Sequence, residues 1–151
     1  MLIFREMPCA ALSAQEPQAE KLLALWPEPS PLPVTDSEAA IIVYEDDVLI
    51  GIAVISAKLT DTKPKCAVVS RLIMAPAARR HGLGRMLMGQ TAGATLNRGA
   101  YFIAARVPDT DEARAFAHSV GFKETPLFSD MLIFDLTDVE GLRHGTLKPH
   151  E

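Results

Sequence analysis

This sequence contains few cysteines and no long hydrophobic run. Only Cys9 and Cys66 occur among the 151 residues, and no metal-ligand spacing relates them. This pattern predicts a reduced compartment, no disulfide framework and no bound metal. No uninterrupted apolar stretch approaches the ~18–20 residues that a membrane-spanning helix requires. The first residues include charge and no basic segment, so we expect no secretory signal and predict a cytoplasmic protein without membrane contact.

Positive charge is also in short supply. Fifteen Lys and Arg side chains oppose nineteen Asp and Glu, a net charge of −4, which argues against bulk nucleic-acid binding. No Asp or Glu occurs between Ala67 and Pro108. Within that stretch lies a basic cluster, made up of Arg71, Arg79, Arg80, His81 and Arg85. One basic cluster in an acidic chain predicts a local anionic ligand rather than a polymer.

Length and composition are those of one ordinary globular domain. The 151 residues are 48% hydrophobic and 23% charged, which excludes a disordered chain. We expect one domain at 1–136 and a C-terminal tail at 137–151, where periodicity is weak. Hydrophobic periodicity and turn residues predict the element order β-α-β-β-β-α-β-α-β-β, an α/β (α+β) fold without internal repeats.

The predicted helices have recognisable ends. Ser13 and Glu16 have capping-box spacing, which predicts one helix running to Trp26, before a proline-rich segment. A second helix is expected from Leu83 to Asn97, and a third from a cap at 109–111 to Gly121. Inside the second helix, Gly89 and Gly93 predict close packing of helix on sheet. Strands are expected at 1–6, 40–44, 48–55, 66–74, 100–107, 122–125 and 131–136.

The most informative stretch joins the strand at 66–74 to the helix that begins at Leu83. Pro76 ends the strand, and Arg79-Arg80-His81-Gly82-Leu83-Gly84-Arg85 follows. A helix N-terminus carries partial positive charge and exposes backbone N–H groups, and glycines allow an anion to approach that backbone. Arginine adds countercharge in a geometry that suits phosphate. The stretch therefore indicates a phosphate-bearing ligand.

Other interpretations of this stretch can be tested against the sequence. A P-loop is excluded because no Gly-x-x-x-x-Gly-Lys-Ser/Thr run exists. The dinucleotide-binding pattern Gly-x-Gly-x-x-Gly fails because its last position is Leu87. Taken alone, the stretch is also compatible with a nucleic-acid patch or with a solvated helix start that contains glycine.

In its context, Arg79-x-x-Gly82-x-Gly84 resembles the acyl-CoA-binding motif Arg/Gln-x-x-Gly-x-Gly/Ala of the GNAT superfamily of N-acyltransferases. The predicted element order is similar to that of the family over roughly residues 1–136, most strongly over 66–122. The resemblance implies a mixed, mostly antiparallel central sheet flanked by helices. It also implies acetyl-CoA, or another short acyl-CoA, as the ligand.

The resemblance further implies which residues hold that ligand. The diphosphate of CoA would bind backbone amides from Arg80 to Arg85, and the pantetheine arm would pair with the strand end Leu72–Met74. Arginine side chains would reach the 3′-phosphate, and an N–H near Met74 would polarise the thioester carbonyl. The implied binding residues are Leu72, Ile73, Met74, Ala78, Arg79, Arg80, His81, Gly82, Leu83, Gly84 and Arg85.

The sequence departs from the family where proton transfer is concerned. Many members carry a Tyr, as acid for the departing thiolate, five residues before the Phe of a Gly-Phe pair; here that position is Ala117. The next residue, His118, points roughly a quarter-turn away on a helix. The strand at 66–74 has only Ser70 and Arg71 as polar residues and therefore no carboxylate base. No catalytic residue is assigned.

Two functions follow from these features. The first is transfer of an acetyl group from acetyl-CoA to a primary amine of a small molecule or a protein. The second is an acetyl-CoA-sensing regulator of a partner protein. It is suggested by Trp26-Pro27-Glu28-x-Ser30-Pro31, which resembles the PanZ (PanM) subgroup, whose members promote self-cleavage of the aspartate decarboxylase zymogen. That subgroup also lacks the tyrosine, and we expect a monomer or a homodimer in either case.

Overall fold

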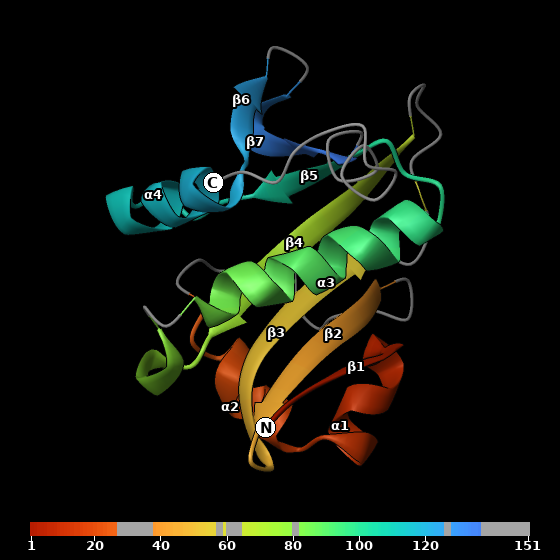
Figure 1. Ribbon diagram of the computed structural model, residues 1–151, viewed down its shortest axis with the longest axis vertical. Helices are drawn as coiled ribbons and strands as arrows, with labels where there is room; N and C mark the ends of the chain where they lie inside the picture. Colours follow the sequence, from red (N-terminus) through yellow and green to blue (C-terminus); the bar gives the residue numbers. More distant parts are fainter. Residues whose placement is uncertain (27–37, 57–58, 60–64, 80–81, 126–127, 137–151) are drawn as a thin grey trace. The chain divides into compact units, whose positions relative to one another are not determined.

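The computed structural model describes residues 1–26, 38–56, 59, 65–79, 82–125 and 128–136 (Figure 1). The predicted order of helices and strands is confirmed, apart from the first helix, which is split in two. The proline-rich segment and the predicted tail at 137–151 lie outside the described residues. The elements are β1 (Leu2–Pro8), the 3-10 turn η1 (Cys9–Ala11), α1 (Leu12–Gln15), α2 (Gln18–Leu23), β2 (Glu38–Glu45), β3 (Val48–Ser56), β4 (Cys66–Met74), the 3-10 turn η2 (Pro76–Ala78), α3 (Leu83–Asn97), β5 (Phe102–Arg106), α4 (Asp111–Val120), β6 (Lys123–Thr125) and β7 (Phe128–Asp135).

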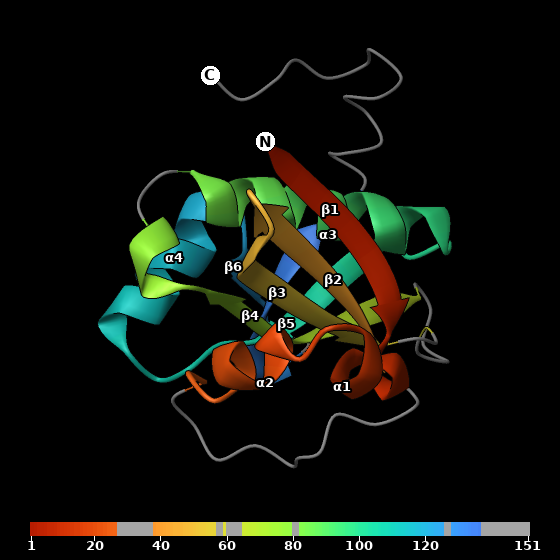
Figure 2. The same ribbon diagram turned by 90° about the horizontal axis from the view of Figure 1, so that it is seen from below.

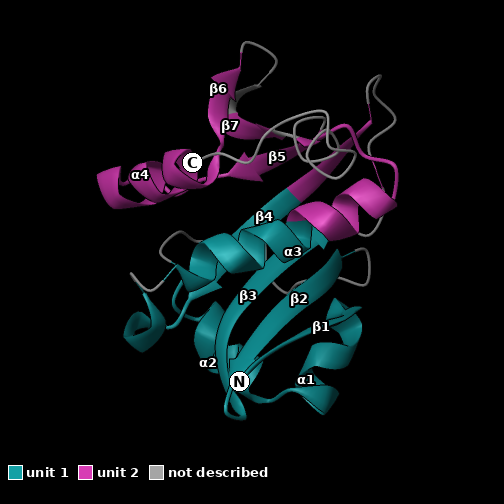
Figure 3. Cartoon of the chain, viewed as in Figure 1, with its two compact units in different colours: residues 1–58, 69–91 teal, residues 59–68, 92–151 magenta. Residues whose placement is uncertain are grey.

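The strands form a seven-stranded, mostly antiparallel sheet in the order β1-β2-β3-β4-β5-β7-β6, which confirms the predicted α+β class. The chain forms two compact units (Figure 3). The first comprises residues 1–58 and 69–91, and the second comprises 59–68 and 92–151, so that β4 and α3 contribute to both. A single domain over 1–136 stays a prediction.

In the first unit the sheet is covered on both faces. Every residue of β2 from Ala39 to Tyr44 is buried, as expected for a strand with packed layers on either side. Figure 2 shows α1 and α2 on one side of these strands and α3 on the other. Beneath α1 and α2 the core of this unit contains Met7, Leu12, Ala19, Leu22, Ala40, Ile42, Leu49, Ile52, Val54 and Ile73.

The prediction of one helix from Ser13 to Trp26 is wrong. The chain instead forms α1 and α2, which are separated by Glu16 and Pro17. Proline lacks the N–H that would continue the first helix, and its ring clashes with the preceding turn. Ser13 lies inside α1, whose N-cap is Ala11, so the predicted capping box does not form.

Glu16 has a different role, at the break between the helices. It is only 7% exposed, and its carboxylate accepts the backbone N–H of Gln18 at 3.0 Å and the hydroxyl of Tyr44 on β2. Burial and the neighbouring carboxylate raise the pKa of Tyr44. The hydrogen bonds that this buried carboxylate accepts compensate for its loss of water. Through them, Glu16 links the first residue of α2 to the sheet.

The hairpin of β2 and β3 forms as predicted. Asp46 and Asp47 connect the strands with φ values of 50° and 69°. Two successive positive φ values are characteristic of the type I′ turn, whose twist matches that of the flanking strands. Both aspartates are exposed, in agreement with their interpretation as solvated turn residues.

In the second unit, β7 pairs antiparallel with β5 and β6. The predicted ends of α4 are confirmed: the hydroxyl of Thr110 accepts the N–H of Ala113 at 3.1 Å, and Gly121 follows the helix at φ 113°. A Cβ at Gly121 would lie 3.0 Å from the ring of Phe134, so glycine is required there for space as well as for conformation. A buried cluster of this unit contains Cys66, Phe102 and Ala104, with Met131 and Ile133 against it.

The predicted close packing at Gly89 and Gly93 is wrong. A Cβ at either position would meet no atom within 4 Å, and Gly89 is exposed. The close approach occurs instead in the sheet, at Gly51 of β3. A Cβ at Gly51 would lie 2.7 Å from Sδ of Met74 and 2.9 Å from Cγ1 of Val43. Glycine at this position allows the end of β4 to pack closely on the strand beside it.

Candidate functional site

The end of β4 is the first part of the predicted site. Leu72–Met74 pairs antiparallel with Gly51–Ala53 of β3. Ile73 is buried in the core beneath α1 and α2, and Met74 is 8% exposed and packs over Gly51. On its other side β4 neighbours β5 in the strand order. The predicted ligand would pair with backbone groups of this strand end.

A β-bulge precedes this strand end. Arg71 pairs with Val54 and Val69 pairs with Ile55, so that Ser70 is the extra residue of β4. A bulge bends its strand and changes the direction of the residues beyond it. The hydroxyl of Ser70 donates to Oε2 of Glu38 at 2.8 Å, and this contact holds the bulge.

Glu38 is a carboxylate beside β4 that the sequence analysis did not identify. It comes from the start of β2, and no local signal in the sequence relates it to Ser70. Met74 is four residue steps along the strand from Ser70, a distance of about 13 Å at ~3.3 Å per residue. Glu38 therefore supports the bulge rather than the strand end. The buried Arg71 directly follows the bulged residue Ser70.

Residues 75–82 connect β4 to α3, and of these 80 and 81 lie outside the described residues. The N–H of Ala75 donates to the carbonyl of Ile50 at 2.8 Å, and η2 follows directly. Ala78 is buried, whereas Arg79 is exposed. Nε of Arg79 donates to the carbonyl of Met74 at 3.2 Å, so this arginine fastens the turn to the strand end. A guanidinium has five N–H donors, so most of them are left for a ligand.

The N-terminus of α3 completes the predicted site. Gly82 has φ 75°, and its carbonyl accepts the first intrahelical bond, from the N–H of Met86 at 3.2 Å. The amides of Leu83, Gly84 and Arg85 precede that bond and have no acceptor within the helix. The first turn contains no acidic residue, and a Cβ at Gly82 would meet no protein atom within 4 Å. These features fit an anion at the helix end.

The predicted binding residues fall in one continuous stretch of the first unit. Of the eleven, Arg80 and His81 lie outside the described residues, and the other nine belong to the run from Leu72 to Arg85. The exposed side chains of Arg79 and Arg85 flank the start of α3. That this stretch holds a ligand stays a prediction.

The position where the family carries its tyrosine belongs to the second unit. Ala117 is buried at 6% exposure and has no proton to donate, whereas Phe116 is 36% exposed. Nε2 of His118 lies 2.7 Å from Oε1 of Glu124. A backbone hydrogen bond and the contact with His118 lower the pKa of Glu124. His118 is therefore an exposed, carboxylate-paired side chain, as its position on α4 indicated.

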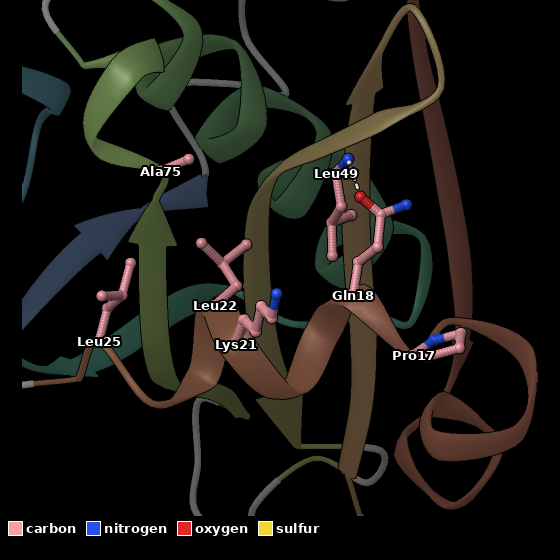
Figure 4. Close-up of a pocket in the computed structure, with 7 residues that line it drawn as sticks. All are labelled: Pro17, Gln18, Lys21, Leu22, Leu25, Leu49 and Ala75. Atoms are coloured by element: carbon pink, nitrogen blue, oxygen red, sulfur yellow. Dashed lines mark hydrogen bonds between the residues drawn. The ribbon is translucent and has the colours of Figure 1, made fainter.

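A groove of about 550 Å³ runs along α2 in the first unit (Figure 4). It includes Ala75, the residue directly after β4. The sequence analysis did not identify it, since its walls come from three separate parts of the chain. Its lining residues are Pro17, Gln18, Lys21, Leu22, Leu25, Leu49 and Ala75.

Residues 5–122 match the Acetyltransferase (GNAT) family, and the chain belongs to that family of acyl-CoA N-acyltransferases. The predicted family is thereby confirmed. A comparison with curated proteins found no match.

Solved structures with the same fold include several acetyltransferases. A GNAT-family protein from Desulfovibrio desulfuricans has 15% identity and a TM-score of 0.69, with 90% of this chain and 99% of that chain covered. The PaiA N-acetyltransferase of Thermoplasma acidophilum, in complex with coenzyme A, has 12% identity and a TM-score of 0.64, with coverages of 89% and 99%. The aminoglycoside N-acetyltransferase AAC(6′)-Iy, in complex with CoA, has 20% identity and a TM-score of 0.63, with coverages of 83% and 90%. At these identities the similarity establishes the fold.

None of the helices in the described residues has the length and apolar character needed to cross a bilayer. In the same part of the chain, no three His, Cys, Asp or Glu side chains are grouped so that they could hold a metal ion.

Proposed function

We propose that this protein uses acetyl-CoA to acetylate a primary amine of a small molecule or a protein. The observation that carries the proposal is the succession of three features in the first unit. A strand end that pairs with β3 leads into the 3-10 turn η2, and a helix N-terminus flanked by Arg79 and Arg85 follows. CoA combines an extended amide-containing arm with a diphosphate, so it suits both parts of this stretch.

Each part of the donor has a partner in this proposal. The diphosphate binds the amides at the start of α3, beside Gly82, where the first turn of the helix contains no acidic residue. The pantetheine arm pairs with the backbone of Leu72–Met74 as a short additional strand. Arg79 and Arg85 supply countercharge to the phosphates, and an N–H near Met74 polarises the thioester carbonyl.

The donor supplies a thioester that is already activated for attack by an amine. The neutral amine nitrogen forms a bond to the carbonyl carbon, the C–S bond breaks, and its electron pair leaves on sulfur. The amine gives up one proton to solvent, and the thiolate takes one from solvent, because Ala117 cannot donate. Proximity, orientation and carbonyl polarisation carry the reaction in this scheme.

Two measurements test the proposal. Calorimetry with CoA and acetyl-CoA should show binding to the folded protein, and a panel of amines, peptides and polyamines should then release free thiol from acetyl-CoA. Absence of binding at millimolar ligand, with the protein shown to be folded, would refute the donor assignment. Binding without thiol release from any acceptor would refute the transfer reaction alone.

The buried Ala117 favours a second candidate function, an acetyl-CoA-dependent regulator of a partner protein. Such a regulator needs the ligand to bind but needs no acid for a leaving thiolate. By linkage, acetyl-CoA would raise the affinity for the partner, and the partner would raise the affinity for acetyl-CoA equally. The test is self-cleavage of the aspartate decarboxylase zymogen with the protein present, with and without acetyl-CoA. Cleavage that does not depend on acetyl-CoA would eliminate this candidate.

A further inference from the structure

The groove along α2 has a regular construction. Gln18, Lys21, Leu22 and Leu25 are spaced i, i+3, i+4 and i+7, so they form one stripe along the helix and the turn after it. Leu49 at the start of β3 faces that stripe from the sheet (Figure 4). Leu22 is buried at 5% exposure, whereas Leu25 is 43% exposed. The buried Leu22 therefore forms an apolar floor of the groove, and the side of the groove at Leu25 is open to solvent.

Lys21 is the only charged residue of the seven that line this groove, and none of them is acidic. Among the described residues its ammonium forms no ion pair, since the pairs found there involve other groups. The side-chain amide of Gln18 is already engaged: Oε1 accepts the N–H of Leu49 at 3.0 Å, and Nε2 donates to the carbonyl of Asp47 at 3.3 Å. In Figure 4 the Lys21 side chain extends between Leu22 and Gln18. Among the described residues that line the groove, a ligand would thus meet one available charge, and that charge is positive.

One end of the groove adjoins the strand end where the proposed function requires the thioester. Ala75 lines the groove and directly follows Met74 in the chain. Its N–H is held by the carbonyl of Ile50 at 2.8 Å, so this end of the groove is fixed to β3. A molecule lying along α2 would therefore have one end close to the proposed acetyl group and the rest beside Lys21 and the leucines.

We propose that this groove is the acceptor site, and that it selects an amine that also carries a carboxylate and an apolar side chain. This inference rests on the proposed acetyl transfer. The carboxylate pairs with Lys21, the apolar side chain lies on Leu22 and Leu25, and the amine nitrogen points towards Ala75. A leucine-sized amino acid or a short peptide fits a groove of about 550 Å³.

The same arrangement disfavours polycationic acceptors. Polyamines and aminoglycosides carry several ammonium groups and are bound by acidic side chains, but the lining residues include none. A second ammonium in the groove would also be repelled by Lys21. The reaction itself is unchanged: the amine gains the acetyl group and loses a proton to solvent, and CoA leaves as the thiol.

Leucine and leucinamide form the matched pair of probes, because they share the apolar side chain and differ in the carboxylate charge and, as a consequence, in the basicity of the amine. The readout is the ratio of kcat/KM for leucine to that for leucinamide, measured by thiol release at saturating acetyl-CoA. Comparing this ratio between variants cancels the intrinsic difference in amine basicity. Lys21→Ala should lower the ratio about fivefold, the upper range for an exposed ion pair, through KM rather than kcat. Lys21→Arg should preserve it, and Lys21→Glu should lower it further and improve spermidine as an acceptor.

Lys123→Ala is the matched control, since it removes an exposed cation from β6 in the second unit. It should leave the ratio unchanged. If Lys21→Ala and Lys21→Glu also leave it unchanged while amines still release thiol, this inference is overturned and the transfer reaction stands. If no amine releases thiol, calorimetry of leucine and leucinamide on the CoA-saturated protein supplies the corresponding ratio of binding affinities. A lack of leucine binding there, or binding that Lys21→Glu does not weaken, overturns the inference equally.

Discussion

Replacing Gly82 by aspartate or by asparagine isolates the charge at the start of α3 from every other property of that position. The two side chains have nearly the same size and shape. Both are favoured at a helix N-cap, and both tolerate the left-handed backbone that φ 75° requires better than other residues do. A Cβ at Gly82 would meet no protein atom within 4 Å, so neither variant is expected to disturb packing. Any difference in ligand affinity between them reports the charge.

The size of that difference follows from Coulomb's law. Two unit charges 4 Å apart interact with about 4 kcal/mol at the effective dielectric of a protein surface. Even half of that repulsion, about 2 kcal/mol, weakens binding of a diphosphate about thirtyfold, since ~1.4 kcal/mol corresponds to tenfold. Salt should reduce the difference, because a Debye length of ~8 Å at physiological ionic strength falls as salt is added.

Calorimetric titration with CoA measures the effect, and thermal melts verify that both variants are folded. Pantetheine, which has no phosphate, should bind both variants equally and serves as the control ligand. Equal affinities of the aspartate and asparagine variants for CoA at low salt would show that the diphosphate does not bind beside Gly82. The assignment of the start of α3 as the anion site would then be refuted.

Three further predictions concern stability and side-chain chemistry. Gly51→Val should lower the unfolding free energy by ~1–3 kcal/mol in denaturant titrations, because its Cβ meets Met74 Sδ at 2.7 Å, and Met74→Ala should restore part of the loss. Tyr44→Phe should cost ~1–3 kcal/mol, since the buried carboxylate of Glu16 loses its hydroxyl donor. The pKa of Tyr44 is higher in the folded protein than in the unfolded chain, where it is near 10. The free energy of unfolding of the wild type should therefore decrease as the pH rises above 10. This decrease should be smaller in Tyr44→Phe, which lacks the titrating hydroxyl. Burial raises the pKa of Cys9 to about 11, so a thiol reagent at pH 8 should modify it only on unfolding, and rapid labelling of the folded protein would contradict this.

The sequence by itself determined those features that depend on short stretches of chain. Periodicity and turn residues predicted nearly every helix and strand, because burial of one face imposes a period of 2 or 3.6 on local sequence. The caps of α4 at Thr110 and Gly121 were readable for the same reason, since a cap involves residues three or four apart. The stretch from Leu72 to Arg85 is continuous in the chain, so its resemblance to the acyl-CoA motif could be recognised without a structure.

Tertiary structure decided the features that join distant segments. Glu16 seemed to cap a helix by its spacing, but Pro17 breaks that helix and Tyr44, 28 residues away, binds the carboxylate. Glu38 reaches the bulge at Ser70 across 32 residues. The groove along α2 acquires its walls from α2, β3 and the turn after β4, and only their packing makes Lys21 the single charged side chain among its described lining residues. Such contacts depend on the register of the strands and on how the helices pack against the sheet. Both are set by the burial of the whole core rather than by any local pattern.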